Sequence, residues 1–255
     1  MKNTKPIKIF HLFPRSMSLY GDRGNLVALK AILEMNDYSV EIIDDETVPF
    51  KNGGNDLVYM GSGPRQCASL GADRLLKHIN EFHMSVECGE KWLLTGNAMS
   101  MLGKETTSPN GVFPAAGILP FTTFYNPDKR YLSDALTDDR NIFGRECVGF
   151  INTSCVYSGI ETPAFNLVLG KEAGNEKPSS AEGIICDNIF ATQLTGPFLV
   201  KNPHALTYFA SLITGEEITL PEESDTVKAY DTATKELHSR IKEVHTSAKH
   251  TNRLS

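Results

Sequence analysis

The segment WLLTGNAMSMLG, residues 92–103, combines features that together favour an α/β fold. Residues 92–94 form an apolar run of strand length, and residues 95–97 predict a tight turn that leads into a helix. In many α/β enzymes such a strand-to-helix elbow carries the catalytic nucleophile at its tip. Gly96 occupies the tip here. The segment therefore predicts a strand–turn–helix unit, which is either a purely structural turn that uses glycine for its backbone conformation or a catalytic elbow whose nucleophile is missing.

The chain before this elbow alternates between strand and helix patterns. Apolar runs at residues 8–13, 39–45 and 55–63 predict strands. Two amphipathic faces predict the helices between them, one formed by Leu26, Leu29, Ile32 and Leu33 and the other by Leu75, Leu76, Ile79 and Phe82. Strands separated by such helices build βαβ units, and therefore a mostly parallel sheet covered on both faces. We predict a three-layer, flavodoxin-like or Rossmann-like α/β fold.

The second half of the chain is richer in strands and turns. Extended segments broken by Pro, Asn and Gly run over residues 111–136 and 146–159, and residues 170–183 predict a polar surface loop. A helix then follows, with Asn202 as N-cap, Pro203 in its first turn and Gly215 just past its end.

A separate helix is predicted after Pro221, because apolar residues recur at alternating steps of three and four. Asp231/Lys235 and Glu236/Arg240 have the spacing of (i, i+4) ion pairs. We expect a domain at residues 1–220, a helical extension at 221–247 and a disordered tail at 248–255. The extension either docks on its own domain or contacts a partner, including a second copy of the chain in a homodimer.

Composition excludes several classes of function. The 255 residues carry a net charge of −6, and no run of Lys and Arg exceeds two residues, which argues against nucleic-acid binding. No apolar stretch reaches the length of a membrane span, and the N-terminus lacks the features of a signal peptide. The five cysteines and seven histidines show no metal-ligand spacing, so we expect no metal, no cofactor and a cytoplasmic protein with free, mainly buried thiols.

Two further segments are candidates for a site. GSGPRQ, residues 61–66, is a second glycine turn after a strand, where Pro64 removes one N–H that a phosphate cradle would use. It favours a close backbone approach to a ligand or to a neighbouring loop, and Arg65 is suited to hold a carboxylate or phosphate. In LYGDRGN, residues 19–25, Asp22 and Arg23 either cap a helix and pair with a carboxylate or line a site at the sheet edge. His11 and His204 each stand alone in the sequence, so we expect both to have structural or solvated roles.

The order of these motifs along residues 8–213 resembles the CobB/CobQ-type class I glutamine amidotransferases. Within that class the chain most resembles the glutaminase subunit of lipid II isoglutaminyl synthase, which works with a Mur-ligase-like, ATP-dependent partner. The resemblance is carried by LYGDRGN, GSGPRQ, MLG (101–103), GFIN (149–152), LGKEAGN (169–175) with the later EG (182–183), and QLTGPFLVKNP (193–203). It implies the class I amidotransferase fold, and the helix after Pro221 is an extension outside it.

The resemblance also implies that the catalytic groups are lost. The family elbow reads C-G-G-Y-Q-L-L-G, and Gly96 takes the place of its cysteine. Thr195 stands at the position of the histidine base. In the family run G-F-E-N-H-x-G-R-T, the acid, the histidine and the glutamine-binding arginine are replaced here by Ile151, Thr153 and Val156. Because loss of either cysteine or histidine removes most of the rate, the resemblance implies a catalytically silent protein.

What remains is a candidate pocket without catalytic residues. Its expected members are Gly61, Ser62, Gly63, Arg65, Gly96, Asn97, Asn152, Cys155 and Thr195. The leading hypothesis is a silent scaffolding or regulatory subunit of a Mur-ligase-like partner in cell-wall precursor or cofactor amidation. The alternatives are a small-molecule sensor that uses this pocket, another enzyme that employs Cys155, Ser100 or Thr195, and a subunit of the amidating ligase that has unrecognised catalytic groups or relies on free ammonia.

Overall fold

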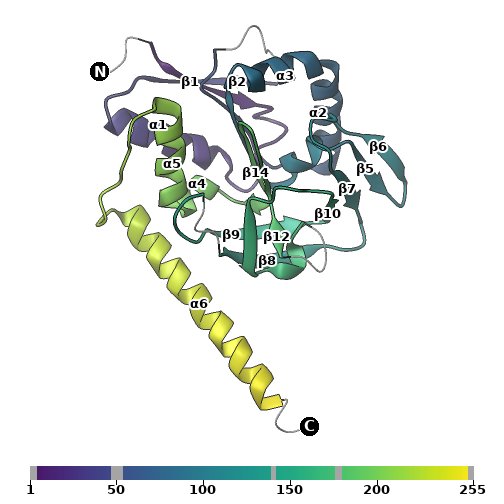
Figure 1. Ribbon diagram of the computed structural model, residues 1–255, viewed down its shortest axis with the longest axis vertical. Coiled ribbons are helices and arrows are strands. Elements are labelled where there is room, and N and C mark those ends of the chain that lie inside the picture. Colours follow the sequence, from purple (N-terminus) through teal and green to yellow (C-terminus); the bar gives the residue numbers. More distant parts are fainter. Residues whose placement is uncertain (1–4, 47–53, 139–141, 176–179, 252–255) are drawn as a thin grey trace.

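A six-stranded sheet forms the centre of the protein (Figure 1). The computed structural model describes residues 5–46, 54–138, 142–175 and 180–251, with side chains up to residue 243. The strand order is β13-β14-β4-β3-β1-β2, and all pairs are parallel except β13 with β14. The strands are β1 (Ile7–Leu12), β2 (Val40–Asp45), β3 (Leu57–Met60), β4 (Lys91–Thr95), β13 (Ile184–Cys186) and β14 (Ile189–Thr192). The mostly parallel sheet is thus confirmed.

Helices cover both faces of this sheet because alternate residues of each buried strand are apolar on both sides. On β3, Leu57 and Tyr59 face one hydrophobic cluster, whereas Val58 and Met60 face the other. The first cluster contains side chains of α1 (Arg23–Met35), α4 (Phe198–Lys201) and α5 (Pro203–Thr214), and the second those of α2 (Arg65–Lys77) and α3 (Ile79–Glu87). The three-layer α/β architecture is confirmed.

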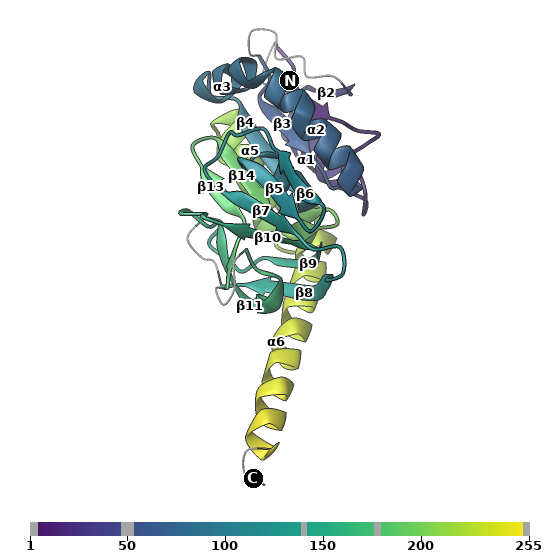
Figure 2. The same cartoon turned by 90° about the vertical axis from the view of Figure 1, so that its right-hand side faces the viewer.

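Two smaller sheets built from the second half of the chain lie beside this core (Figure 2). The sheet β10-β7-β5-β6 contains β5 (Glu105–Ser108), β6 (Gly111–Pro114), β7 (Thr122–Tyr125) and β10 (Cys155–Ser158). The sheet β12-β11-β8-β9-β15 contains β8 (Tyr131–Thr137), β9 (Val148–Thr153), β11 (Phe165–Leu169), β12 (Ala181–Glu182) and β15 (Leu194–Thr195). The segment predicted as a polar loop holds a short 3-10 turn, η2 (Lys171–Ala173), and β12, and residues 176–179 lie outside the described part.

The structure corrects two helix predictions. The elbow leads into a six-residue 3-10 helix, η1 (Gly96–Met101), and not into an α-helix. The carbonyls of Met101 and Gly103 accept hydrogen bonds from Ala116 and Gly117, so they are committed to a neighbouring loop and not to a continuing helix. The single amphipathic helix expected around residues 75–82 is two helices, α2 and α3, which meet at His78.

The last helix, α6 (Asp225–Thr251), packs its first half on the small sheet and extends away from the body (Figures 1 and 2). Tyr230 and Leu237 form a small apolar cluster with Leu136 of β8 and Val148 of β9. The predicted pair Glu236–Arg240 is present, whereas Asp231 pairs with Arg145, 2.9 Å away, on the preceding body of the protein.

The domain boundaries and the homodimer contact through α6 stay predictions. Of the segment expected as a tail, residues 248–251 lie within α6, and residues 252–255 fall outside the described part. In the described ranges, no helix is long and apolar enough to cross a membrane.

Tyr230 offers a test of how α6 is attached. Its hydroxyl donates a hydrogen bond of 2.7 Å to the carbonyl of Glu146, and its ring is buried against His204. We expect Tyr230→Phe to lower the free energy of unfolding by about 1 kcal/mol, because it removes this bond and keeps the ring. Urea denaturation measures the change. Tyr208→Phe is the matched control, since no hydrogen bond of that hydroxyl occurs among the described residues. Equal losses in the two variants would contradict the assignment.

Candidate functional site

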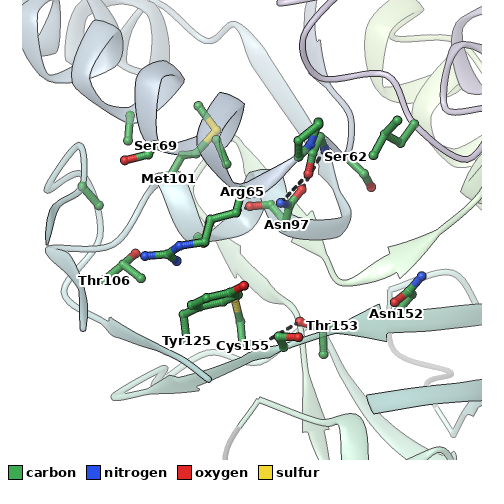
Figure 3. Close-up of a pocket in the computed structure, with 18 of the residues that line it drawn as sticks. Ser62, Arg65, Ser69, Asn97, Met101, Thr106, Tyr125, Asn152, Thr153 and Cys155 are labelled. Atoms are coloured by element: carbon green, nitrogen blue, oxygen red, sulfur yellow. Dashed lines mark hydrogen bonds between the residues drawn. The ribbon is translucent and has the colours of Figure 1, made fainter. Parts of the chain in front are cut away.

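A cavity of about 350 Å³ lies between the elbow, the start of α2 and the small sheet of β7 and β10 (Figure 3). Seven of the nine expected pocket residues line it, namely Ser62, Gly63, Arg65, Asn97, Asn152, Cys155 and Thr195. Gly61 and Gly96 are not part of the lining, because Gly61 packs against Asp22 and Met17, and Gly96 packs against Ser62 and Thr195. Of the three replaced family positions, Thr153 lines the cavity, whereas Ile151 and Val156 do not.

The elbow keeps a strained backbone although it has no nucleophile. Gly96 has a φ of +62°, in the left-handed region that favours glycine. A Cβ atom at this position would lie 1.8 Å from Ser62 Oγ, 2.9 Å from Ser62 Cβ and 3.2 Å from Thr195 Cγ2. The space that a side chain at the elbow tip would need is therefore occupied by the hydroxyl of Ser62.

Thr195, at the position of the family base, is turned toward the backbone of the neighbouring strand. Its Oγ1 donates a hydrogen bond of 2.8 Å to the carbonyl of Phe150 on the neighbouring strand β9, and its methyl group faces Gly96. A hydroxyl with this orientation has its proton committed, and a threonine does not accept a proton near neutral pH. The hydroxyl at the position of the family base is thus engaged in a hydrogen bond to the neighbouring strand.

Asp22 lies buried directly behind Ser62. Its Oδ2 accepts a hydrogen bond from the Ser62 N–H, and its Oδ1 has no partner among the described residues. Burial raises the pKa of Asp22 to about 6, against the lowering effect of that backbone hydrogen bond. The predicted helix cap is wrong in this respect, because α1 begins after Asp22 without a bond from its side chain. The carboxylate instead holds the glycine turn.

Arg23 lies away from the cavity. Its guanidinium donates hydrogen bonds of 2.9 and 3.0 Å to the carboxylate of Asp44. This agrees with the interpretation in which Arg23 pairs with a nearby carboxylate. The other interpretation, in which Asp22 and Arg23 line the site, is not what the structure shows, because neither residue is part of the cavity lining. The first helical turn of α1 directs Arg23 toward the end of β2, where Asp44 is exposed to meet it.

A network of buried side-chain hydrogen bonds connects β3 and α1 to Thr95, the residue before the elbow tip. The hydroxyl of Tyr59 on β3 contacts Asn25 Nδ2 at 2.8 Å and Thr95 Oγ1 at 2.9 Å. Asn25 Oδ1 in turn accepts the N–H of Leu199 on α4. Thr95 therefore points away from the cavity, as expected for the residue before the tip. The sequence analysis did not identify this network, because its members come from elements far apart in the chain.

Asn97 joins the elbow to the glycine turn through two hydrogen bonds. Its Oδ1 accepts the Gly63 N–H at 2.9 Å, and its Nδ2 donates to the Gly63 carbonyl at 2.7 Å. The close approach predicted for GSGPRQ is confirmed, since a Cβ on Gly63 would lie 2.6 Å from the carbonyl oxygen of Ser16. Because the Gly63 N–H is already bonded, one of the backbone donors near the elbow tip is not available to a ligand.

The charged groups that line the cavity are two arginines. Arg65 at the start of α2 extends over Tyr125, with 3.9 Å between its Cζ and the ring centroid, as Figure 3 shows. Arg130 Nε donates to Asn152 Oδ1 at 2.6 Å, and Asn152 Nδ2 donates to the hydroxyl of Tyr20. Sequence reasoning missed Arg130 and Tyr125, since no motif marks them, and in LYGDRGN it chose Asp22 and Arg23 rather than Tyr20. Only the fold brings these three side chains together.

The thiol and hydroxyl groups in the cavity lack the setting of a nucleophile. Burial raises the pKa of Cys155 to about 11, although Arg65 acts in the opposite direction, so the thiol is protonated at neutral pH. Ser100 Oγ donates to the carbonyl of Asn97. Neither has a histidine beside it in the cavity lining. In the described part of the chain, no group of three or more His, Cys, Asp or Glu side chains is placed to hold a metal ion.

His11 and His204 lie outside the cavity, in line with the structural roles expected for them. Desolvation lowers the pKa of His11, whose Nδ1 contacts Asp44 at 2.9 Å. Desolvation also lowers the pKa of His204 to about 4, and its Nε2 lies 3.4 Å from Cys147 Sγ.

None of the five cysteines forms a disulfide. Cys147 and Cys155 are buried, whereas the expectation of mainly buried thiols is wrong for the partly buried Cys67 and Cys186 and the exposed Cys88.

No family model matches the sequence. The chain is similar to subunit GatD of lipid II isoglutaminyl synthase (glutamine-hydrolyzing) from Staphylococcus aureus, with 27% identity over 207 residues, 79% of this chain and 82% of the relative. The GatD of Streptococcus pneumoniae is 25% identical over 234 residues, 86% of each chain.

Among solved structures, PurLQS from Thermotoga maritima matches with a TM-score of 0.50 and 12% identity, covering 89% of this chain and 99% of that one. A glutamine amidotransferase matches with a TM-score of 0.50 and 14% identity, covering 80% of this chain and 98% of that one. The chain therefore has a class I glutamine amidotransferase-like fold and is similar in sequence to GatD, which confirms the resemblance.

Proposed function

We propose that this glutamine amidotransferase-like chain does not hydrolyse glutamine and acts as a scaffolding or regulatory subunit. The occupied space at Gly96 carries the proposal. A missing cysteine alone would leave a vacant elbow, whereas here Ser62 Oγ fills the position and Thr195 Oγ1 is bonded to Phe150. Both sites of the family's reaction are thus built for packing.

The partner class follows from the similarity to GatD, which is itself a subunit of an amide-forming synthase. The similarity spans most of this chain, which supports a place in the same kind of assembly. We infer that the partner is an ATP-dependent, Mur-ligase-like enzyme that acts on cell-wall precursors in the cytoplasm. A silent subunit would stabilise or regulate that enzyme while ammonia comes from another source.

The first test is the release of glutamate and ammonia from L-glutamine by the purified chain. We expect no release above the buffer background, because loss of either nucleophile or base already removes most of the rate of such a site. The Staphylococcus aureus GatD in complex with its ligase partner serves as the positive control. Turnover at an enzyme-like rate would contradict the proposal, and Ser62→Ala and Cys155→Ala would then show which side chain is responsible.

A second measurement addresses the partner. The chain is co-expressed with the Mur-ligase-like protein of its source cells, and the complex is isolated by size-exclusion chromatography. We expect a stable complex that forms amide from ATP and ammonium but not from ATP and glutamine. Two proteins that elute separately would rule out the subunit role, and amide formation from glutamine would rule out silence.

A further inference from the structure

The cavity has a charge opposite to that of the chain. The whole protein carries −6, yet the charged side chains of the lining are Arg65 and Arg130, and no Asp or Glu is among the lining residues. Two guanidinium groups without a carboxylate in the same cavity are unfavourable by themselves, because like charges repel and the half-buried guanidinium of Arg65 loses hydration. An anion that enters the cavity would relieve both effects.

Arg65 is held in a position suited to bind an oxyanion. Its guanidinium lies 3.9 Å from the ring centroid of Tyr125 and 5.5 Å from that of Phe113 (Figure 3). No ion pair of Arg65 with a carboxylate occurs among the described residues. Stacking on an aromatic face leaves the N–H groups at the edge of the guanidinium free for a bidentate contact with a carboxylate or phosphate.

Ser62 supplies an independent observation. Ser62 is 2% exposed and lines the cavity, and its Oγ makes no well-formed hydrogen bond among the described residues, although the hydroxyl lies close enough to Asp22 to lower the pKa of that carboxyl. A buried hydroxyl without a well-formed hydrogen bond is unfavourable, so a ligand atom that accepts from it or donates to it would be stabilised. The neighbouring Gly63 N–H is already bonded to Asn97, which leaves the Ser62 hydroxyl as the group at this end of the cavity that a ligand can bond.

Arg130 marks the rim of the same cavity. It is exposed, and Asn152 fixes its Nε, while Asn152 is in turn bonded to the hydroxyl of Tyr20. The guanidinium of Arg130 forms no ion pair with a carboxylate in the described part of the chain. A cavity of about 350 Å³ has the size of sites for small metabolites.

We propose that this cavity binds a small organic oxyanion, a carboxylate or a phosphate, with Arg65 as the main anchor and Ser62 and Arg130 as additional contacts. Binding of this kind needs neither a nucleophile nor a base, so it goes beyond the silent-subunit proposal and does not depend on it. It supplies the ligand that a regulatory subunit would sense.

Isothermal titration calorimetry tests the proposal with three probes. Glutarate and inorganic phosphate represent the two oxyanions, and glutaramide has the skeleton of glutarate without its charges. We expect saturable binding of at least one anion and none of glutaramide. Arg65→Gln should weaken anion binding tenfold or more, Arg65→Lys should weaken it less because it keeps the charge, and Ser62→Ala should weaken it severalfold.

Arg15→Gln is the matched control, because Arg15 is exposed and lies outside the cavity lining, so the net charge changes equally. Tighter binding of phosphate than of glutarate would identify a phosphorylated ligand, and the reverse order a carboxylate. The proposal is overturned if neither anion saturates up to about 20 mM, if Arg65→Gln leaves the affinity unchanged, or if glutaramide binds as well as glutarate. None of these outcomes bears on glutamine hydrolysis.

Discussion

Gly96→Ala is expected to lower the free energy of unfolding by about 4 kcal/mol, a large loss for the addition of one methyl group. Two effects add at this position. The φ of +62° costs about 1–2 kcal/mol for a residue that has a Cβ. The new Cβ would also lie 1.8 Å from Ser62 Oγ and 2.9 Å from Ser62 Cβ, so the Ser62 side chain must shift although the residue is almost completely buried. Chemical denaturation of both proteins measures the loss.

A double-mutant cycle separates the two effects. In a Ser62→Gly background both close contacts disappear, and Gly96→Ala should then cost only the backbone term, which leaves a coupling energy of about 2 kcal/mol. Gly117→Ala is the matched control, because Gly117 has a φ of +70° and nothing within 4 Å of an added Cβ. Additive losses for Gly96 and Ser62 would show that Ser62 does not fill the elbow.

This coupling has a consequence for attempts to restore activity. A cysteine at position 96 brings the same Cβ as alanine and a sulfur atom in addition, so Gly96→Cys alone should destabilise the protein at least as much. A nucleophile at position 96 is therefore incompatible with Ser62, whose side chain occupies the space that a Cβ atom at position 96 would need. Restoring a cysteine and a histidine base would require substitutions at positions 62, 96 and 195 together.

Asp22→Asn is expected to make the protein more stable at pH 7.5 and to have much less effect at pH 4.5. Burial raises the folded-state pKa of Asp22 to about 6, above its value near 3.9 in the unfolded chain. Between these values the folded state holds a proton that the unfolded state has released, so this residue's contribution to stability falls as pH rises from about 4 to about 6. The difference amounts to about 3 kcal/mol.

Asparagine removes this loss because it is neutral at every pH and its Oδ1 can still accept the Ser62 N–H. The measurement is urea denaturation of wild type and variant at pH 4.5 and 7.5. Comparison at each pH cancels the contributions of other groups, among them Glu182, whose pKa burial raises to about 7. Asp73→Asn on the exposed face of α2 is the control and should change stability by less than about 0.5 kcal/mol. A pH-independent effect of Asp22→Asn would contradict the raised pKa.

Local patterns were sufficient for much of the fold. The continuous apolar runs of β3 and β4 predict strands that are buried on both faces, and the positions of Asn202, Pro203 and Gly215 predict the bounds of α5. The end of the elbow helix was not predictable in this way. Its carbonyls at Met101 and Gly103 are claimed by a loop more than ten residues further along the chain, and that competition exists only in the folded state.

Some features of the candidate site could likewise be predicted from the sequence, and others could not. Gly96 at the elbow and Thr195 at the base position can be read from the chain alone, because a residue type is a local property that alignment to a pattern can reveal. The filling of the elbow by Ser62 Oγ, the hydrogen bond from the Ser62 N–H to Asp22 and the stacking of Arg65 on Tyr125 arise only in the folded protein. These contacts join segments tens of residues apart, and their geometry is set by the packing of the whole core, which no short stretch of sequence encodes.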